Sequence, residues 1–128
     1  MKKRPLILVV EDNEANQVLA TAVLELAGYR VELASSAKEA VERLTTNQPD
    51  LILMDVQLPG EDGLGLTRRL KADPKTAMIP IVALTAHAMV GDREVALAAG
   101  CVGYIAKPIN TRTFAEQIRQ YLVSDAAA

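Results

Sequence analysis

The chain has 128 residues, 50% of them hydrophobic, and a formal net charge of −2. This length predicts one domain with a substantial apolar core. The small net charge gives no electrostatic reason to expect direct binding to nucleic acid or to an anionic membrane. No apolar run approaches the ~20 residues of a membrane span, so we expect a cytoplasmic protein. The only cysteine, Cys101, excludes an internal disulfide bond and a cysteine-based zinc cluster.

The first predicted strand is the continuous apolar run Leu6 to Val10, which is typical of a strand covered on both faces. A helical pattern follows and is expected to stop at Gly28. The predicted buried face of this helix consists of Leu19, Ala22, Val23 and Leu26. Residues 30 to 34 then alternate between polar and apolar side chains, which predicts a second strand.

The second helix and the third strand come next. Ser36 and Glu39 have the spacing of a capping box at the start of the helix. The residues predicted to face the core are Ala37, Ala40, Val41 and Leu44. After a break at residues 47 to 49, the apolar run Leu51 to Met54 is too short for a helix core and leads directly to Asp55. We therefore place Asp55 at the carboxyl end of a central strand.

The second half of the chain continues the same alternation. A third helix is expected from Asp62 to just before Pro74, because the residue before a proline avoids the helical region. Ile81 to Leu84 is the fourth strand, a fourth helix runs from about residue 88 to residue 99, and Gly103 to Ala106 is a short fifth strand. The last helix carries apolar residues at intervals of four: Phe114, Ile118 and Leu122.

Strand and helix thus alternate five times, which predicts an α/β protein with a parallel sheet between two helical layers. The first, third and fourth strands are wholly apolar and suit the centre of the sheet, whereas the alternating second strand and the short fifth strand suit its edges. The strand order 2-1-3-4-5 satisfies these assignments. With right-handed crossovers, it places a crevice between the first and third strands.

Polar residues follow four of the five predicted strands. Glu11 and Asp12 follow the first strand, Asp55 the third, Thr85 the fourth and Lys107 the fifth. Because the carboxyl ends of parallel strands share one edge, these side chains are expected to converge. Three neighbouring carboxylates repel one another, and a hard divalent cation such as Mg²⁺ relieves that repulsion. With the ammonium group of Lys107, the edge is suited to a metal ion together with a phosphoryl group.

Each of these residues also has a purely structural interpretation. Asp12 would cap the first helix, Thr85 would cap the fourth helix, and Lys107 would be a surface charge. Their convergence at a single edge of the sheet favours a functional site over three unrelated structural roles.

Five stretches, in this order and spacing, resemble the response-regulator receiver domain, the phosphoacceptor module of two-component signalling. They are Ile7 to Asn13, Asp50 to Pro59, Gly63-Leu64, Leu84 to Ala86 and Gly103 to Pro108. The resemblance covers about residues 5 to 123 and implies a single receiver domain over residues 1–128, with a flavodoxin-like, doubly wound (βα)5 fold. Within the family, the chain is similar to single-domain regulators and to the receivers of hybrid histidine kinases.

The resemblance implies a role for each acidic residue. Asp55 is the phosphoacceptor nucleophile. Asp12 binds Mg²⁺ directly, Glu11 binds it through water, and Asp55 is a further ligand. Gln57 supplies its backbone carbonyl to the metal. Glu11 stands where many family members have aspartate, which leaves the kind of metal contact made at this position less defined.

The resemblance also implies how the phosphorylated domain is read. Lys107 pairs with one phosphoryl oxygen, Thr85 binds another after a loop shift, and Tyr104 turns inward with Thr85. The peptide bond before Pro108 is expected to be cis, as X-Pro bonds allow.

The expected partners are a histidine kinase or a histidine phosphotransfer protein that donates the phosphoryl group in a phosphorelay. A downstream protein is expected to bind the face of the fourth helix, fifth strand and fifth helix. His87 is interpreted as a loop or helix-start residue near this face, and Met89 and Val90 as exposed apolar residues. We expect no output domain in this chain, which would either act by binding alone or be one domain of a larger protein. It is expected to be a monomer or a phosphorylation-dependent dimer, and to be no enzyme beyond its own phosphorylation and dephosphorylation.

Three other functions are compatible with this topology. An unphosphorylated interaction module would not need Asp12, Asp55, Thr85 and Lys107 together. A flavin mononucleotide protein would need a phosphate-binding loop after the first strand, where the acidic pair repels phosphate. An aspartyl-phosphate phosphatase would need a second aspartate two residues after the nucleophile, where Gln57 stands.

Overall fold

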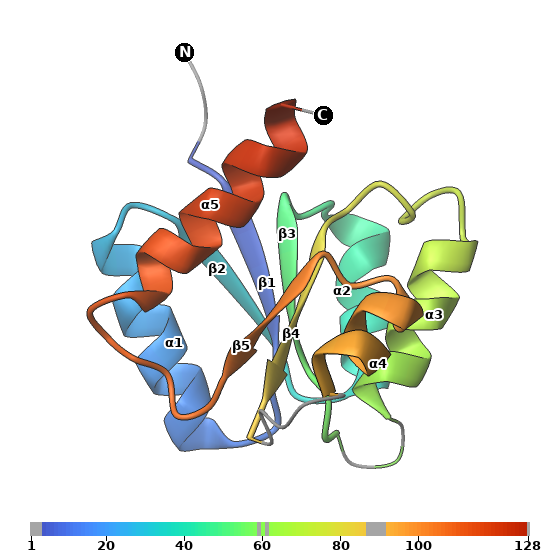
Figure 1. Ribbon diagram of the computed structural model, residues 1–128, viewed down its shortest axis with the longest axis horizontal. Helices are drawn as coiled ribbons and strands as arrows, with labels where there is room; N and C mark the ends of the chain where they lie inside the picture. Colours follow the sequence, from blue (N-terminus) through green and yellow to red (C-terminus); the bar gives the residue numbers. More distant parts are fainter. Residues whose placement is uncertain (1–3, 59, 61, 87–91, 128) are drawn as a thin grey trace.

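The computed structural model describes residues 4–58, 60, 62–86 and 92–127. Within them, five parallel strands form one sheet in the order β2-β1-β3-β4-β5, which confirms the predicted topology (Figure 1). The strands are β1 (Leu6–Val10), β2 (Arg30–Ala34), β3 (Leu51–Asp55), β4 (Ile81–Thr85) and β5 (Gly103–Ala106).

Strands β3 and β4 each extend one residue beyond their predicted apolar runs. Asp55 pairs with Leu84, and Thr85 pairs with Ala106, in the parallel ladder. A ladder is built from backbone hydrogen bonds, so it can continue through a polar residue. Asp55 and Thr85 are therefore anchored in the sheet itself and not in the loops that follow.

The five described helices cover both faces of the sheet (Figure 1). Helices α1 (Glu14–Leu26) and α5 (Phe114–Ala127) lie on one face, and α2 (Ala37–Thr46), α3 (Gly63–Ala72) and α4 (Asp92–Ala99) lie on the other. The predicted start of α4 near residue 88 lies outside the described residues, as do His87, Met89 and Val90. Among the described residues, no helix combines the length and apolarity that crossing a membrane requires.

The core consists of two apolar clusters, one on each face of the sheet. Successive strand residues point to opposite faces, so each central strand contributes to both clusters. The cluster beneath α1 and α5 contains Leu24, Phe114 and Ile118, each fully buried. The cluster beneath α2, α3 and α4 contains Leu66 and Leu70, which lie one turn apart on α3. The sheet is thus held rigidly from both sides, which fixes its carboxyl edge.

The buried face of α1 differs from the prediction at two of the four positions. Ala22 is exposed and Leu26 is 91% exposed, whereas Leu19 and Val23 are half-buried as expected. The residues that are fully buried are Ala20 and Leu24. Residues two apart in a helix lie about 200° apart around its axis, so Leu24 and Leu26 face opposite directions. The prediction was wrong because it combined two faces of the helix.

Side chains cap the starts of α2 and α3. Ser36 Oγ accepts the N–H of Glu39 at 3.1 Å, as the capping box requires. The carboxylate of Glu39, however, accepts the N–H of Ser35 and not that of Ser36. Asp62, where the third helix was expected to start, caps α3 and accepts the N–H of Leu64 at 3.1 Å. Helix α3 therefore begins at Gly63, eight positions after Asp55.

Candidate functional site

The three predicted carboxylates meet at the carboxyl edge of the sheet. Glu11 and Asp12 directly follow β1, and Asp55 is the last residue of the neighbouring β3. Each offers an oxygen, and these oxygens all lie within 4.8 Å of one another. Glu11 and Asp55 are only 1% and 2% exposed, whereas Asp12 is open to solvent. The cluster therefore has two carboxylates shielded from solvent and a third that solvent can reach.

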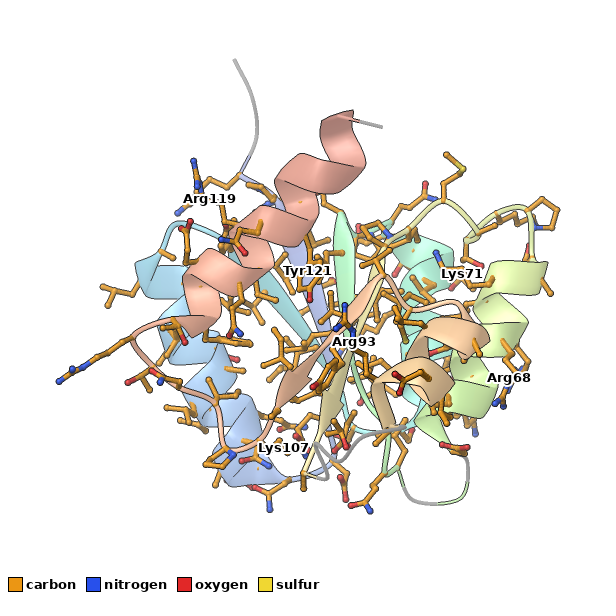
Figure 2. All side chains as sticks on the ribbon, in the orientation of Figure 1. Arg68, Lys71, Arg93, Lys107, Arg119 and Tyr121 are labelled. Carbon is orange, nitrogen blue, oxygen red and sulfur yellow. The ribbon has the colours of Figure 1, made fainter. Side chains whose placement is uncertain are left out.

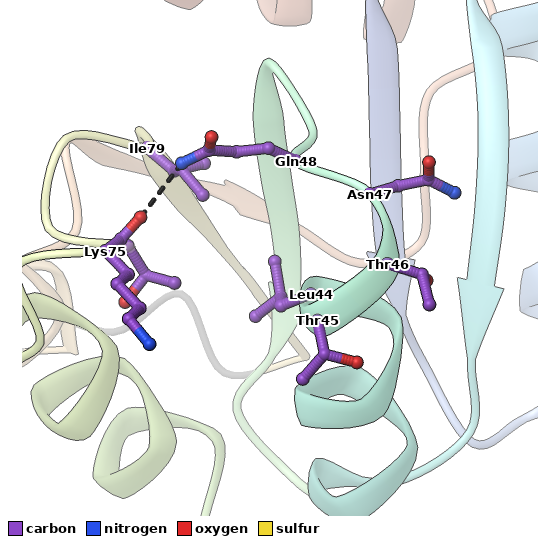
Figure 3. A pocket seen from close by; sticks show the side chains of 8 residues that line it. Leu44, Thr45, Thr46, Asn47, Gln48, Lys75 and Ile79 are labelled. Carbon is purple, nitrogen blue, oxygen red and sulfur yellow. Dashed lines mark hydrogen bonds between the residues drawn. The ribbon is translucent and has the colours of Figure 1, made fainter.

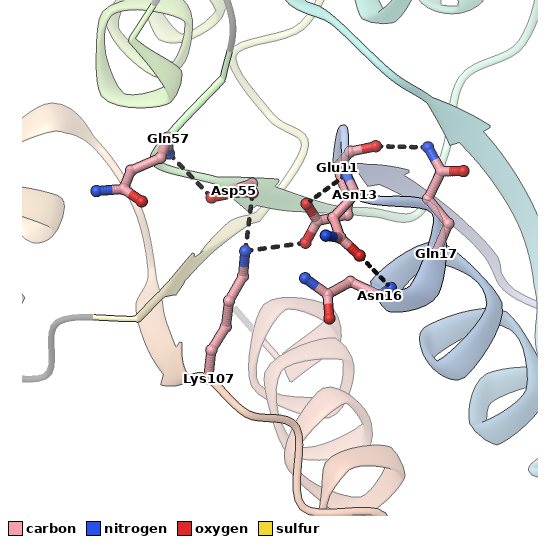
Figure 4. A network of polar contacts seen from close by, with 7 residues as sticks. All are labelled: Glu11, Asn13, Asn16, Gln17, Asp55, Gln57 and Lys107. Atoms are coloured by element: carbon pink, nitrogen blue, oxygen red, sulfur yellow. Dashed lines mark hydrogen bonds and ion pairs between the residues drawn. The ribbon is translucent and has the colours of Figure 1, made fainter.

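Lys107, which follows β5, joins two of these carboxylates. Its Nζ lies 2.9 Å from Asp55 Oδ2 and 3.0 Å from Glu11 Oε1 (Figure 4). Among the basic residues labelled in Figure 2, Lys107 lies at the carboxyl edge of the sheet, beside the three carboxylates. Lys71 and Arg119 lie toward the opposite edge. The side chain of Lys107 is 18% exposed. This geometry excludes the interpretation of Lys107 as a simple surface charge.

The charges at the site shift one another's pKa values. Burial raises the pKa of Glu11, and the neighbouring Asp55 adds to that shift, while the N–H of Asn13 and the ammonium of Lys107 oppose it. Burial alone would lower the pKa of Lys107, but its bonds to Asp55 and Glu11 outweigh burial, and the net pKa is raised. Lys107 is therefore a permanent cation at neutral pH. When all four groups are ionised, three carboxylates face this one ammonium.

The loop after β1 is held by two residues for which no role was predicted from the sequence, Asn13 and Gln17. Asn13 caps α1, since its Oδ1 accepts the N–H of Asn16 at 3.0 Å, and its own N–H donates to Glu11 Oε2 at 3.1 Å. Gln17 Nε2 donates to the backbone carbonyl of Glu11 and, at 3.1 Å, to Ser35 Oγ (Figure 4 draws the first of these bonds).

Both of these residues leave a signal in the sequence. Asn13 directly precedes Glu14, and an Asn before an acidic first turn is a typical cap. Gln17 lies three residues before Ala20, in line with the buried stripe of α1, where a polar residue needs a partner. Because Asn13 is the cap, Asp12 is not needed as one, and the structural interpretation of Asp12 is excluded.

Asp55 is oriented by contacts to both of its oxygens. Oδ1 accepts the N–H of Gln57 at 2.9 Å, and Oδ2 accepts from Lys107 (Figure 4). Thr85 is buried at the end of β4, and its backbone carbonyl accepts the N–H of Lys107 at 2.7 Å. The fold thus brings Gln57, Thr85 and Lys107 to the acidic cluster. The Lys107-Pro108 peptide bond is cis, as expected.

Tyr104 is placed differently from the other predicted residues. It lies on β5, three positions before Lys107, and packs half-buried against the apolar cluster beneath α2, α3 and α4. In this structure Tyr104 is part of the core packing near the edge of the sheet, on the same strand that leads to Lys107.

The donor set at this edge fits a hard divalent cation. Such ions prefer oxygen ligands, and carboxylates from two adjacent strands supply them in close proximity. The excess of carboxylates over ammonium groups also leaves negative charge that a divalent cation would neutralise.

A separate groove lies at the opposite end of the sheet. It has a volume of about 440 Å³ and is lined by the end of α2 and by the segment that leads into β4, including Leu44, Gln48, Lys75 and Ile79 (Figure 3). Gln48 Nε2 donates across it to the carbonyl of Lys75 at 2.9 Å. None of the predicted site residues lines this groove, so it is distinct from the acidic cluster.

Comparisons with known proteins agree with this architecture. The family model of the response regulator receiver domain matches residues 7–119. The polar-differentiation response regulator DivK of Brucella ovis is 44% identical over 116 residues, which cover 91% of this chain and 94% of that protein.

Solved structures of receiver domains superpose closely on this chain. The receiver domain of sensor histidine kinase PA1611 from Pseudomonas aeruginosa PAO1, solved with a magnesium ion coordinated in its active site cleft, has a TM-score of 0.84 at 39% identity, covering 94% of this chain and 98% of that one. A CheY-like response regulator receiver domain protein from Methanospirillum hungatei JF-1 has a TM-score of 0.87 at 28% identity, covering 97% and 98%. With the fold, the acidic edge and the family match in agreement, this chain belongs to the response regulator receiver domain family.

Proposed function

We propose that this chain is the phosphoacceptor of a two-component or phosphorelay system, and that Asp55 receives a phosphoryl group from a phosphohistidine of a partner protein. The observation that carries the proposal is the setting of Asp55. Its carboxylate is buried at a strand end, oriented by Gln57 and Lys107, and grouped with two further carboxylates. One receiver domain, with its core at about residues 5 to 123, performs this function.

In the proposed step, a carboxylate oxygen of Asp55 attacks phosphorus in line with the donor imidazole. The phosphorus–nitrogen bond breaks, its electron pair stays with the imidazole, and a phosphorus–oxygen bond forms. The contacts of Asp55 with Gln57 and Lys107 hold the carboxylate in one orientation before transfer. The chain thus acts as a phosphoryl acceptor and not as an enzyme acting on other substrates.

Four residues would hold Mg²⁺ at this site: Glu11, Asp12, Asp55 and the backbone carbonyl of Gln57. Asp12 is exposed and suited to direct contact, whereas both carboxylate oxygens of Glu11 already contact other groups of the chain, which favours contact through water. Bound there, Mg²⁺ would neutralise charge on the phosphoryl oxygens. The magnesium ion in the related PA1611 receiver supports this assignment.

Phosphorylation would switch the domain through Thr85, Tyr104 and Lys107. Moving an equilibrium from 1:99 to 99:1 needs about 5.5 kcal/mol, and hydrogen bonds to charged groups contribute roughly 1.5–3 kcal/mol each. Lys107 already contacts two carboxylates. Only the difference in free energy between these contacts and its new contact with the phosphoryl group would contribute to the shift. We therefore expect a large but incomplete shift, visible in NMR spectra around Thr85 and Tyr104.

Family membership implies interaction with histidine kinases or phosphotransfer proteins. For the downstream target, we propose the face of α4, β5 and α5. Val95 on α4 and Val102 just before β5 are 49% and 45% exposed, and exposed apolar residues at this face are suited to a protein partner. The chain would act as a monomer or as a phosphorylation-dependent dimer.

The decisive experiment is intact mass spectrometry after incubation with acetyl phosphate, with and without Mg²⁺. Wild type is expected to gain one phosphoryl group only when Mg²⁺ is present, and the Asp55→Asn variant is expected to gain none while remaining folded. Equal labelling of Asp55→Asn would refute the assignment of the nucleophile. A folded wild type that is labelled neither by acetyl phosphate nor by a phosphohistidine donor would instead favour an unphosphorylated interaction module.

A further inference from the structure

The first turn of α3 lies unusually close to the backbone of Asp55. A Cβ atom built at Gly63 would lie 2.0 Å from the carbonyl oxygen of Asp55, and 2.9 Å from its carbonyl carbon and from the Cα of Val56. Distances under 3.0 Å essentially never occur for real Cβ atoms. Because the obstructing atoms belong to the backbone, they cannot rotate away as a flexible side chain would.

The glycine is required here for space and not for its backbone angles. The described glycines with positive φ are at positions 28, 60 and 100, and Gly63 is not among them. Any residue could adopt the helical conformation of position 63, but a side chain on it would collide with the strand that carries Asp55.

Three hydrogen bonds hold this close approach in place. The N–H of Gly63 donates to the carbonyl of Val56 at 3.1 Å, which ties α3 to the residue after Asp55. The hydroxyl of Thr67, fully buried one turn later, donates to the carbonyl of Gly63 at 2.9 Å. On the other side, the N–H of Val56 donates to the carbonyl of Leu84 in β4 at 3.1 Å. The backbone at Asp55 and Val56 is thus clamped between α3 and β4.

We propose that Gly63 is a positioning residue for Asp55: its missing side chain lets α3 hold the backbone that carries the phosphoacceptor carboxylate and the Gln57 carbonyl. This inference rests on the proposed function. A methyl group at position 63 would need the carbonyl oxygen of Asp55 to recede from 2.0 Å to at least 3.0 Å. A misplacement of about 1 Å can reduce the rate of a reaction by about 10²-fold.

Gly65 provides a matched control on the same helix. A Cβ at Gly65 would meet only Asp62 Cβ, at 3.9 Å, which is ordinary van der Waals contact. Gly65→Ala is therefore the same chemical change, two residues along α3, without the collision. It is expected to leave phosphorylation unchanged.

The test compares Gly63→Ala, Gly65→Ala and wild type in three measurements. These are the initial rate and saturation of phosphorylation by acetyl phosphate, the Kd for Mg²⁺ from NMR titration, and the amide resonances of residues 55–57. Gly63→Ala is expected to lower the saturated phosphorylation rate by tenfold or more, to weaken Mg²⁺ binding and to move these resonances, while circular dichroism shows a folded protein. Wild-type values for Gly63→Ala in all three measurements would overturn the proposal.

A second variant covers the case in which Gly63→Ala does not fold. Thr67→Val keeps the volume of the buried side chain and removes its hydrogen bond to Gly63. It is expected to move the amide resonances of Val56 and Gln57, and unchanged resonances there would overturn the proposal. If wild type itself takes up no phosphoryl group, the proposed function fails, whereas the resonances of residues 55–57 still decide the role of Gly63.

Discussion

Lys107 stands between two buried carboxylates and has two opposing effects on the site. Its single positive charge reduces the repulsion between Asp55 and Glu11, which it contacts together. It also places positive charge where a metal ion would bind, so it competes electrostatically with Mg²⁺. The consequence is that removing Lys107 should separate phosphoryl transfer from metal binding.

For Lys107→Ala, we expect a phosphorylation rate that is lower by about 10²-fold, because a preorganised charge at the reacting oxygens is lost. The Kd for Mg²⁺ should stay unchanged or decrease, because a competing cation has been removed. Phosphorylation by acetyl phosphate and Mg²⁺ titration by NMR measure the two effects. Lys75→Ala, at an exposed lysine that lines the groove at the opposite end of the sheet, is the control. Labelling of Lys107→Ala at the wild-type rate would contradict the role of Lys107.

Cys101 offers a second test at the residue scale, this time on packing. Burial raises the pKa of its thiol, while Thr67 and the charge of Lys71 oppose that shift. A thiol whose pKa is raised by folding stabilises the folded protein at pH values below its ordinary pKa of 9.0. This contribution is lost as the pH rises through the pKa of the folded state. We expect the free energy of unfolding of wild type, measured relative to Cys101→Ala, to fall above pH 9.

Thiol reactivity checks the same point independently. Cys101 is 5% exposed, so it should react with a disulfide reagent only slowly in the folded protein and fully after denaturation. Rapid reaction of the folded protein at pH 8 would show that the thiol is accessible and that its burial does not control its pKa.

At the scale of the element, α1 shows how the sheet selects one face of a helix. Leu24 is fully buried in the cluster beneath α1 and α5, whereas Leu26 is 91% exposed. Both are leucines in the same helix, two residues apart, so their sequence surroundings are nearly identical. Only the direction of each side chain relative to the sheet distinguishes them.

Substituting each leucine should give very different losses of stability. Leu24→Ala is expected to lower the free energy of unfolding by about 2–5 kcal/mol, because it leaves a cavity in the core. Leu26→Ala should change it by no more than about 0.5 kcal/mol, because the side chain is in solvent. Urea denaturation measures both, and each variant serves as the other's control. Comparable losses for the two variants would mean that α1 is rotated from the position described.

The elements were predicted accurately where a sequence pattern repeats locally. The prediction was weaker for the rotation of a helix about its axis and for the partner of a capping side chain. Apolar runs located β1, β3 and β4, because strands covered on both faces need no polar side. Alternation of polar and apolar side chains located β2. The end of β3 was placed one residue early, because Asp55 breaks the apolar run but not the backbone ladder. At α2, Glu39 was predicted to bond to Ser36 but bonds to Ser35, since one-residue differences in cap partners depend on local geometry.

At the scale of the whole molecule, metal binding should be linked to stability. If the acidic cluster binds Mg²⁺ only when the chain is folded, Mg²⁺ at 100 times its Kd should stabilise the protein by about 2.7 kcal/mol. The melting temperature should then rise by several degrees on addition of Mg²⁺ and return to its starting value with EDTA, as measured by calorimetry.

Two variants sharpen this prediction. Asp12→Asn removes one carboxylate of the cluster and should reduce the increase in melting temperature, whereas Glu94→Gln removes an exposed carboxylate on α4 and should not. An equal increase in both variants would point to nonspecific screening by the salt and not to binding at the cluster.

The sequence by itself determined the order of the elements, the central and edge strands, and the set of polar residues that lie at the carboxyl edge of the sheet. These features follow from local periodicity and from the rules of parallel sheets, so no coordinates are needed. The tertiary structure alone decided which of these residues touch. Lys107 and Asp55 are 52 residues apart in the chain and 2.9 Å apart in space. At position 63, any residue other than glycine would place its Cβ against the backbone of Asp55, and this too depends on how α3 packs on β3. Such contacts depend on distances of a few ångströms between separate elements, which periodicity does not encode.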